Sequence, residues 1–141
     1  MATETTPNGP RDTHAERATL AAGLWHPPWW SEVREHVQPH HFSYIEHQAI
    51  ASALDELSEV GPFVPLVVPD YLASDMYWPS SLTVRIHAVA TITDLNPGPI
   101  AAVCRFADGR HTEAAGVVRA HAVTRDRILA LRYEQRDALD Q

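Results

Sequence analysis

Nine histidines are the first residues of this sequence to consider for chemistry, because imidazole binds metals and transfers protons. Four of them lie close together in the chain, at His36, His40, His41 and His47. Zinc accepts imidazole ligands in a tetrahedral arrangement. The spacing matches no familiar zinc module, however, and Pro39 interrupts any helical register between His36 and His41. We therefore expect neither a metal site nor a cofactor.

Cys104 is the single cysteine, so no disulfide can form within the chain. It lies in the apolar run 100–106, where a thiol usually serves as a small buried hydrophobe rather than as a nucleophile. Asp108 and His111 follow closely and would complete a triad on paper, but triads are defined by geometry and not by nearness in sequence. We expect no catalytic residues here.

The sequence contains no lysine. A phosphate-binding P-loop needs a lysine after its glycine-rich turn, and Schiff-base catalysis needs a lysine amine. The six glycines also lack the P-loop spacing. These absences exclude a P-loop ATPase within this chain and predict a protein that is not an enzyme.

Charge is distributed unevenly along the chain, whose formal net charge is -7. Residues 1–104 carry 4 arginines and 12 carboxylates, whereas residues 105–141 carry 7 arginines and 6 carboxylates. An acidic body disfavours direct binding to nucleic-acid phosphates, which requires clustered cations. The arginine-rich end would instead suit an acidic protein partner.

The elements that position these residues must come from a chain of 141 residues, which predicts one domain with one core. Residues 1–12 are rich in Thr, Pro and Gly and are expected to form a mobile tail ahead of a domain over 13–137. No secretory signal and no long apolar span is present. We expect a cytoplasmic protein that does not contact a membrane.

Apolar residues three and four positions apart predict helices over 14–25, 29–37 and 44–60. Thr13 and Glu16 have the spacing of a capping box at the start of the first helix. An extended link over 64–68 and a short helix over 69–72 are expected next.

Residues 82–93 alternate between apolar and other side chains with a period of two, which is typical of a strand. A single strand has no partner here, so the pattern leaves strand and helix open. A turn over 96–99, a short helix over 100–106 and a long helix over 113–137, capped by Thr112, complete the chain. The predicted fold class is all-α, a compact multi-helix domain ending in a helical hairpin.

The order of these motifs resembles the N-terminal domain of DnaB-type replicative DNA helicases. The matching residues span about 13–132. They are Glu16, Leu20, Leu24, Pro39, Phe42, His47, Ile50, Ala53, Leu57, Gly61, Val118, Arg119, Ala122, Arg125 and Ile128. Two features depart from the family pattern: Pro65 replaces the usual aspartate, and 75–98 is longer than the family's connector.

The resemblance implies a non-catalytic protein-interaction module of DNA replication without the helicase's ATPase domain. It implies self-association and binding to a replicative helicase or primase, with no small-molecule substrate and only indirect contact with nucleic acid. The arginines of the last helix keep an alternative open, a small helical DNA-binding regulator.

Four residues of the last helix are the interface candidates that the resemblance implies: Val118, Ala122, Arg125 and Leu129. The aliphatic members could equally close the domain's own core. Arg125, a charge on an apolar stripe, needs a carboxylate or carbonyl partner within the domain or across a subunit boundary.

His47 is expected to hold a neighbouring helix end by a hydrogen bond, which is a structural role. Of the adjacent pair Trp29 and Trp30, one should lie in the core while the other is partly exposed. An exposed tryptophan would be a natural docking anchor.

Overall fold

The computed structural model describes residues 3–60 and 80–140. Their elements are, in order, β1 (Glu4–Thr6), β2 (Gly9–Arg11), α1 (Thr13–Trp25), α2 (Pro27–Val33), the 3-10 turn η1 (Pro39–His41), α3 (Ile45–Val60), α5 (Ser80–Thr93), α6 (Pro97–Cys104) and α7 (His111–Asp140). The all-α fold class is confirmed, with a small two-stranded hairpin added. Gly61, Pro65 and the predicted elements over 64–72 lie outside the described residues.

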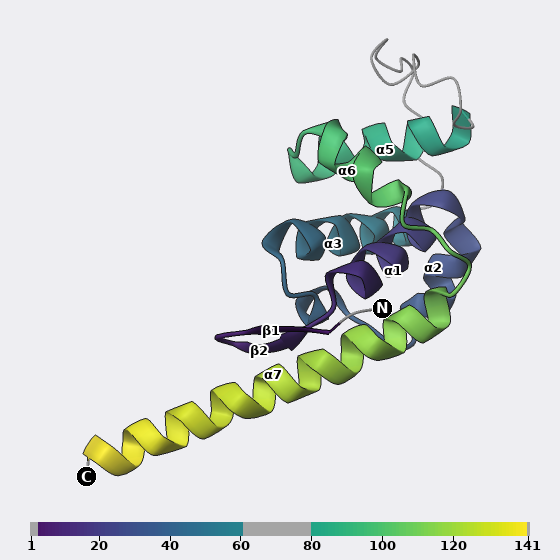
Figure 1. The fold of residues 1–141 in the computed structure, drawn as a ribbon. Coiled ribbons are helices and arrows are strands. Elements are labelled where there is room, and N and C mark those ends of the chain that lie inside the picture. Colours follow the sequence, from purple (N-terminus) through teal and green to yellow (C-terminus); the bar gives the residue numbers. More distant parts are fainter. Residues whose placement is uncertain (1–2, 61–79, 141) are drawn as a thin grey trace.

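Helix α1 lies at the centre of the domain and packs against α2, α3, α5, α6 and α7 (Figure 1). Small side chains allow this close packing, since the four alanines between Ala15 and Ala22 are all buried. At Gly23 a methyl group would lie 2.5 Å from Trp30 Cε3, which is closer than atoms can approach. Glycine is therefore required where α1 meets α2.

Helix α5 settles the open choice for residues 82–93, because the whole segment is helical. Leu82, Ile86 and Val89, spaced by four and three residues, form its buried stripe. Arg85 donates hydrogen bonds from Nε and Nη2 to the carbonyls of Leu24 and Gly23, at 3.0 and 2.7 Å. These bonds satisfy free acceptors at the end of α1, an environment that a strand pattern could not reveal.

Helix α6 begins at Pro97, so the turn predicted over 96–99 is wrong. Asn96 is the N-cap, and its Oδ1 accepts a hydrogen bond of 3.0 Å from the amide of Gly98. Proline suits the first helical position because the amide it lacks has no partner there. The same residue types therefore build a helix start rather than a free turn.

The N-terminal segment is ordered as a hairpin, so the prediction of a mobile tail is wrong for residues 4–11. Strands β1 and β2 pair antiparallel, with Thr6 opposite Gly9. Gly9 adopts a φ of +116°, which glycine tolerates, and β2 packs on α7. Contacts with the distant end of the chain stabilise this segment.

Helix α1 is capped one residue earlier than the capping box predicts. Asp12 is the N-cap, and its Oδ1 accepts a hydrogen bond of 2.9 Å from the amide of Ala15. The amide and hydroxyl of Thr13 instead donate to Glu4 of the hairpin. This arrangement leaves Glu16 free to point into the domain.

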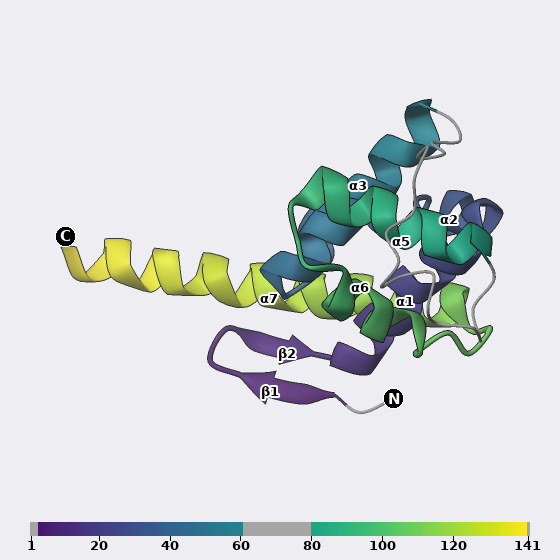
Figure 2. The same cartoon turned by 90° about the horizontal axis from the view of Figure 1, so that it is seen from above.

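The two last helices, predicted as a helical hairpin, follow one another through residues 105–110 and both pack on α1. Helix α7 starts at His111, so Thr112 lies within it rather than capping it. Its first half packs on α1 and α2, its middle contacts the N-terminal hairpin as far as Arg132, and its last turns extend away from the domain (Figure 2). None of the described helices is both long and apolar enough to cross a membrane.

Candidate interaction surface on helix α7

Helix α7 changes from a core helix to an exposed one near its middle. Ala114, Ala115, Val118 and Ala122 are buried against the domain, whereas no residue from 123 to 139 is fully buried. Val118 and Ala122, two of the predicted interface residues, are only 2% and 3% exposed. The structure places both in the domain's own core, where they are unavailable to a partner.

Arg125, the third predicted interface residue, finds its partners within the domain. Its Nη1 donates to the carbonyl of Pro10 at 2.9 Å, and its Nη2 donates to the carbonyl of His41 at 2.6 Å. Burial lowers the pKa of Arg125, while the negative charges of Glu16 and Asp126 act in the opposite direction. Arg125 thus ties α7 to β2 and η1 and fixes the direction in which the helix leaves the domain.

Leu129, the fourth candidate, is 51% exposed and lies on the projecting half of α7. A helix has about 3.6 residues per turn, so Leu129 and Tyr133 continue the side of α7 that Val118 and Ala122 bury in the core. Tyr133 is 58% exposed, and sequence reasoning missed it. The spacing 118, 122, 129, 133 was the available signal. We call Leu129 and Tyr133 the exposed stripe.

Charged residues flank the exposed stripe with opposite signs. Arg132 and Arg136 lie to one side and line a shallow hollow of about 330 Å³ together with Leu129 and Tyr133. By helical geometry, Asp126 and Asp137 lie to the other side. We call the side that carries Arg132 and Arg136 the arginine flank.

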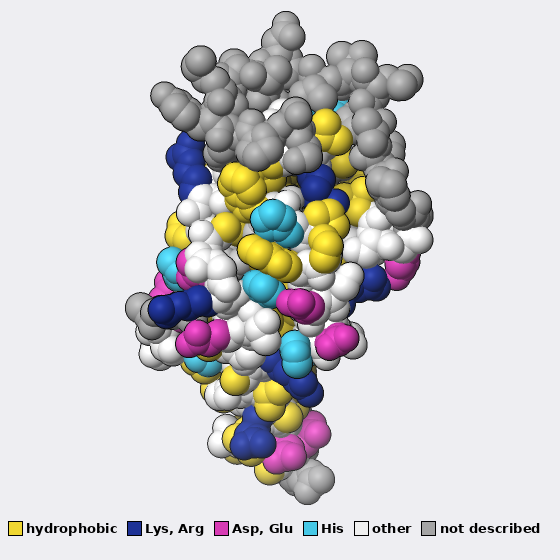
Figure 3. Space-filling model, turned by 90° about the vertical axis from the view of Figure 1, so that its right-hand side faces the viewer, with side chains coloured by type: hydrophobic (Ala, Val, Ile, Leu, Met, Phe, Trp, Pro, Cys, Tyr) yellow, Lys and Arg dark blue, Asp and Glu magenta, His cyan; other side chains and the backbone are white. Residues whose placement is uncertain are grey.

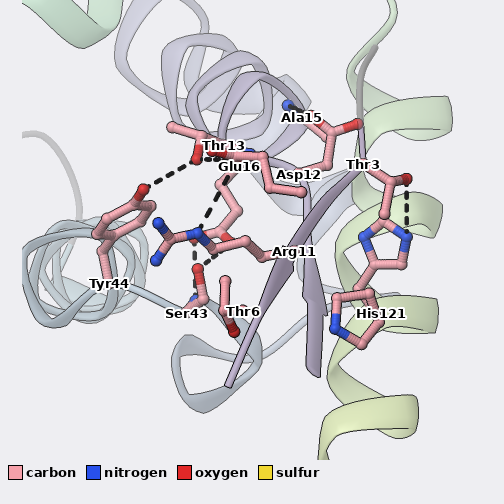
Figure 4. A network of polar contacts seen from close by, with 12 residues as sticks. Thr3, Thr6, Arg11, Asp12, Thr13, Ala15, Glu16, Ser43, Tyr44 and His121 are labelled. Atoms are coloured by element: carbon pink, nitrogen blue, oxygen red, sulfur yellow. Dashed lines mark hydrogen bonds and ion pairs between the residues drawn. The ribbon is translucent and has the colours of Figure 1, made fainter. Parts of the chain in front are cut away.

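The N-terminal hairpin supports the base of the projecting half. Arg132 donates a hydrogen bond to the carbonyl of Pro7, and a methyl group at Gly9 would lie 3.0 Å from both Arg125 Cγ and Ile128 Cδ1. Thr3 Oγ1 lies 3.4 Å from His121 Nε2 (Figure 4). The hairpin therefore contacts α7 from residue 121 to residue 132.

A buried network of hydrogen bonds around the carboxylate of Glu16 links α1 to Ser43 and to α3. Glu16 of α1, 1% exposed, accepts hydrogen bonds from the amide and hydroxyl of Ser43 at 3.0 and 2.6 Å (Figure 4). His47 Nδ1 of α3 lies 2.9 Å from Glu16 Oε1. Burial alone would raise the pKa of Glu16, but the hydrogen bonds from His47 and Ser43 outweigh it and lower that pKa.

The other residues on which the resemblance to the helicase domain rests also pack within the domain. Phe42 and Ile50 are 1% and 2% exposed, and Pro39 begins η1. His47 is 5% exposed and makes the structural contact just described, near the start of a neighbouring helix. These residues therefore build the domain rather than a reactive site.

The histidines and Cys104 do not assemble into a metal or catalytic site among the described residues. No three His, Cys, Asp or Glu side chains of residues 3–60 and 80–140 are placed to hold a metal ion. Cys104 is buried, and burial raises its pKa to about 12. His111 contacts Glu32 at 2.7 Å and Asp108 pairs with His14 at 3.8 Å, so the imagined triad is divided among other partners.

The two adjacent tryptophans have different surroundings. Trp30 is 1% exposed, and its Nε1 donates to Asp55 at 2.9 Å. Trp29 is partly exposed and stacks on His111 at 4.7 Å between ring centroids. Figure 3 shows histidine and hydrophobic side chains mixed on one face of the domain. The environment of Trp29 is already filled by aromatic rings, which weakens its role as a free docking anchor.

A larger hollow of about 530 Å³ lies between the start of α3 and α6. Its lining includes the buried core residues Ile50, Ile100 and Val103. The guanidinium of Arg17 in its wall is already placed over the Phe106 ring, 5.1 Å from the centroid. Polar side chains also line it, but Tyr44 and His47 already contact Thr13 and Glu16, so the hollow offers fewer unpartnered polar groups than the charged flanks of the exposed stripe.

No protein-family model, curated protein or solved structure matches this chain in the three comparisons made.

Proposed function

We propose that this protein is a non-catalytic protein-interaction module of DNA replication, as its resemblance to the helicase N-terminal domain implies. The observation that carries the proposal is the exposed stripe on α7. Leu129 and Tyr133 lie on the same side of α7 as the buried Val118 and Ala122, but at a point of the helix where the domain no longer covers that side. Exposed apolar side chains aligned along one side of a helix are typical of protein-binding surfaces.

The proposed partners are a replicative helicase, a primase or another copy of the chain, in the cytoplasm. Because this chain holds no P-loop, it can by itself add, occupy or block contacts, but it cannot drive movement on DNA. It would therefore regulate helicase assembly or complete a split helicase whose motor lies on another chain.

Direct DNA binding, the alternative, gains little from the projecting half. Residues 126–140 hold three arginines and four carboxylates, so a phosphate backbone would meet both signs of charge. Binding to duplex DNA that weakens steeply with added salt would favour the alternative.

The proposal is tested by size-exclusion chromatography with light scattering, on the protein alone and mixed with its host's replicative helicase or primase. Leu129→Asp should abolish complex formation because it places a charge on the exposed stripe. Leu131→Asp is the matched control, since Leu131 is 52% exposed but lies on the opposite side of α7. Elution without any complex, or equal loss in both variants, would refute the proposed surface.

A further inference from the structure

The charged residues on the two sides of the exposed stripe indicate what kind of partner would bind there. We propose that the projecting half of α7 binds an amphipathic helix of a different protein, one that presents carboxylates beside an apolar stripe, rather than a second copy of this chain. This inference rests on the proposed function and narrows its choice of partner.

A parallel pair of α7 helices is excluded by the domain itself. The exposed stripe lies on the side of α7 that is buried against α1 and β2 in its first half. A second α7 running parallel along that stripe would enter the space that these elements occupy (Figure 1). A bound helix avoids α1 and β2 only if it runs antiparallel to α7, or if it extends no further toward the domain than about residue 126 of α7.

A symmetric antiparallel pair brings the same flank of both helices together. Arg132 and Arg136 of one copy would then face the same arginines of the other. Like charges held close together destabilise an interface, and on the opposite flank Asp126 and Asp137 would repel in the same way. The domain leaves room for an antiparallel pair of α7 helices, but the charges of the projecting half disfavour that pair.

A different helix with acidic side chains removes this conflict. Arg132 and Arg136 are one turn apart on the same side, next to Leu129 and Tyr133 in one shallow hollow. Arg132 donates from Nη2 to the carbonyl of Pro7, and a guanidinium has further N–H donors for a partner. Two carboxylates one turn apart on a partner helix would match them, while leucines of that helix cover the exposed stripe. Arginine suits this role because its planar fork holds carboxylates in a defined geometry.

The test uses two synthetic amphipathic peptides with the same leucine stripe and the same neutral residues along one flank of it. Along the other flank, one peptide carries two glutamates one turn apart and the other carries two lysines. Binding to the full chain is measured by fluorescence anisotropy, and the oligomeric state of the chain alone by light scattering. We expect a monomer that binds the glutamate peptide about tenfold more tightly than the lysine peptide, a scale set by two exposed ion pairs.

The double variant Arg132→Glu with Arg136→Glu should reverse the preference between the peptides. Arg119→Glu with Arg127→Glu changes the net charge equally but at exposed positions away from the arginine flank, so its preference should remain. Equal binding of both peptides, or reversal in both variants, would overturn the assignment. A dimer of the wild-type chain that Leu129→Asp dissociates would show that a second copy is the occupant.

Failure of this inference is distinguishable from failure of the proposed function. Helicase or primase binding that is lost in Leu129→Asp but unchanged in the arginine-flank variant would overturn the inference alone. A glutamate-peptide preference without helicase or primase binding would overturn the proposed replication role alone.

Discussion

Removing the buried carboxylate of Glu16 should destabilise the domain more than any surface change. Its oxygens accept three contacts, from the Ser43 amide, the Ser43 hydroxyl and His47, in a side chain that is 2% exposed. Glu16→Ala leaves those groups unpaired in the interior. Leaving a buried donor without its acceptor costs about 1–3 kcal/mol, so the loss of all three partners should cost about 3–5 kcal/mol. For a domain of this size, the melting temperature should fall by roughly 10–15 °C.

The variant Glu16→Gln removes the negative charge of the side chain but keeps its size and shape. An amide oxygen can still accept from the Ser43 amide and His47, and the amide nitrogen can donate to the Ser43 hydroxyl, so the loss should be about 1–2 kcal/mol. Glu46→Ala, an exposed carboxylate in the same region, is the matched control and should stay within about 0.5 kcal/mol of wild type. The assay is urea unfolding followed by circular dichroism.

The pH dependence provides a second test of the same network. The pKa of Glu16 is lowered in the folded state, so its charge stabilises the fold above the ordinary glutamate pKa of 4.5. That contribution is lost as pH falls through the lower folded-state pKa. The stability difference between wild type and Glu16→Gln should therefore narrow below about pH 4.5. A difference that stays constant to pH 3, or a Glu16→Ala variant as stable as Glu46→Ala, would refute the reasoning.

Three further predictions concern packing, capping and the thiol. Gly23→Ala should destabilise by about 1–3 kcal/mol, because its methyl group would meet Trp30 at 2.5 Å, whereas Gly116→Ala, with nothing within 4 Å, should stabilise by about 0.5–1 kcal/mol in thermal melts. Arg85→Met should cost about 1.5–3 kcal/mol in urea unfolding, because the last carbonyls of α1 lose their donors. Cys104 should resist a thiol reagent at pH 8 until urea unfolds the chain, because burial raises its pKa to about 12; rapid labelling of the native protein would contradict this.

Sequence patterns predicted the elements whose side chains follow one local rule. The stripe from Ile50 to Leu57 predicted α3, and the start of that helix is off by only one residue. Residues 82–93 could not be assigned, because β-branched residues alternate along a helix that is buried on more than one side. Their helical form depends on contacts with α1 and α3, which local spacing does not record.

The candidate surface was only partly predictable, for a similar reason. The sequence placed Val118, Ala122, Arg125 and Leu129 on one side of a long helix, but it could not locate the point at which the domain stops covering that side. The limit is set by the N-terminal hairpin, whose Pro10 carbonyl accepts from Arg125. Because composition predicted a mobile tail there, Tyr133 and the arginine flank were missed.

Amide hydrogen exchange of the chain, alone and mixed with the proposed partner, a replicative helicase or primase, tests the central claim most directly. Residues 126–139 of α7 project from the domain and are expected to exchange rapidly in the free protein. Binding should slow exchange over this segment, most strongly around Leu129 and Tyr133, while α5 and α6 remain unchanged. Protection confined to the body of the domain, with the projecting half still exchanging rapidly, would contradict the account.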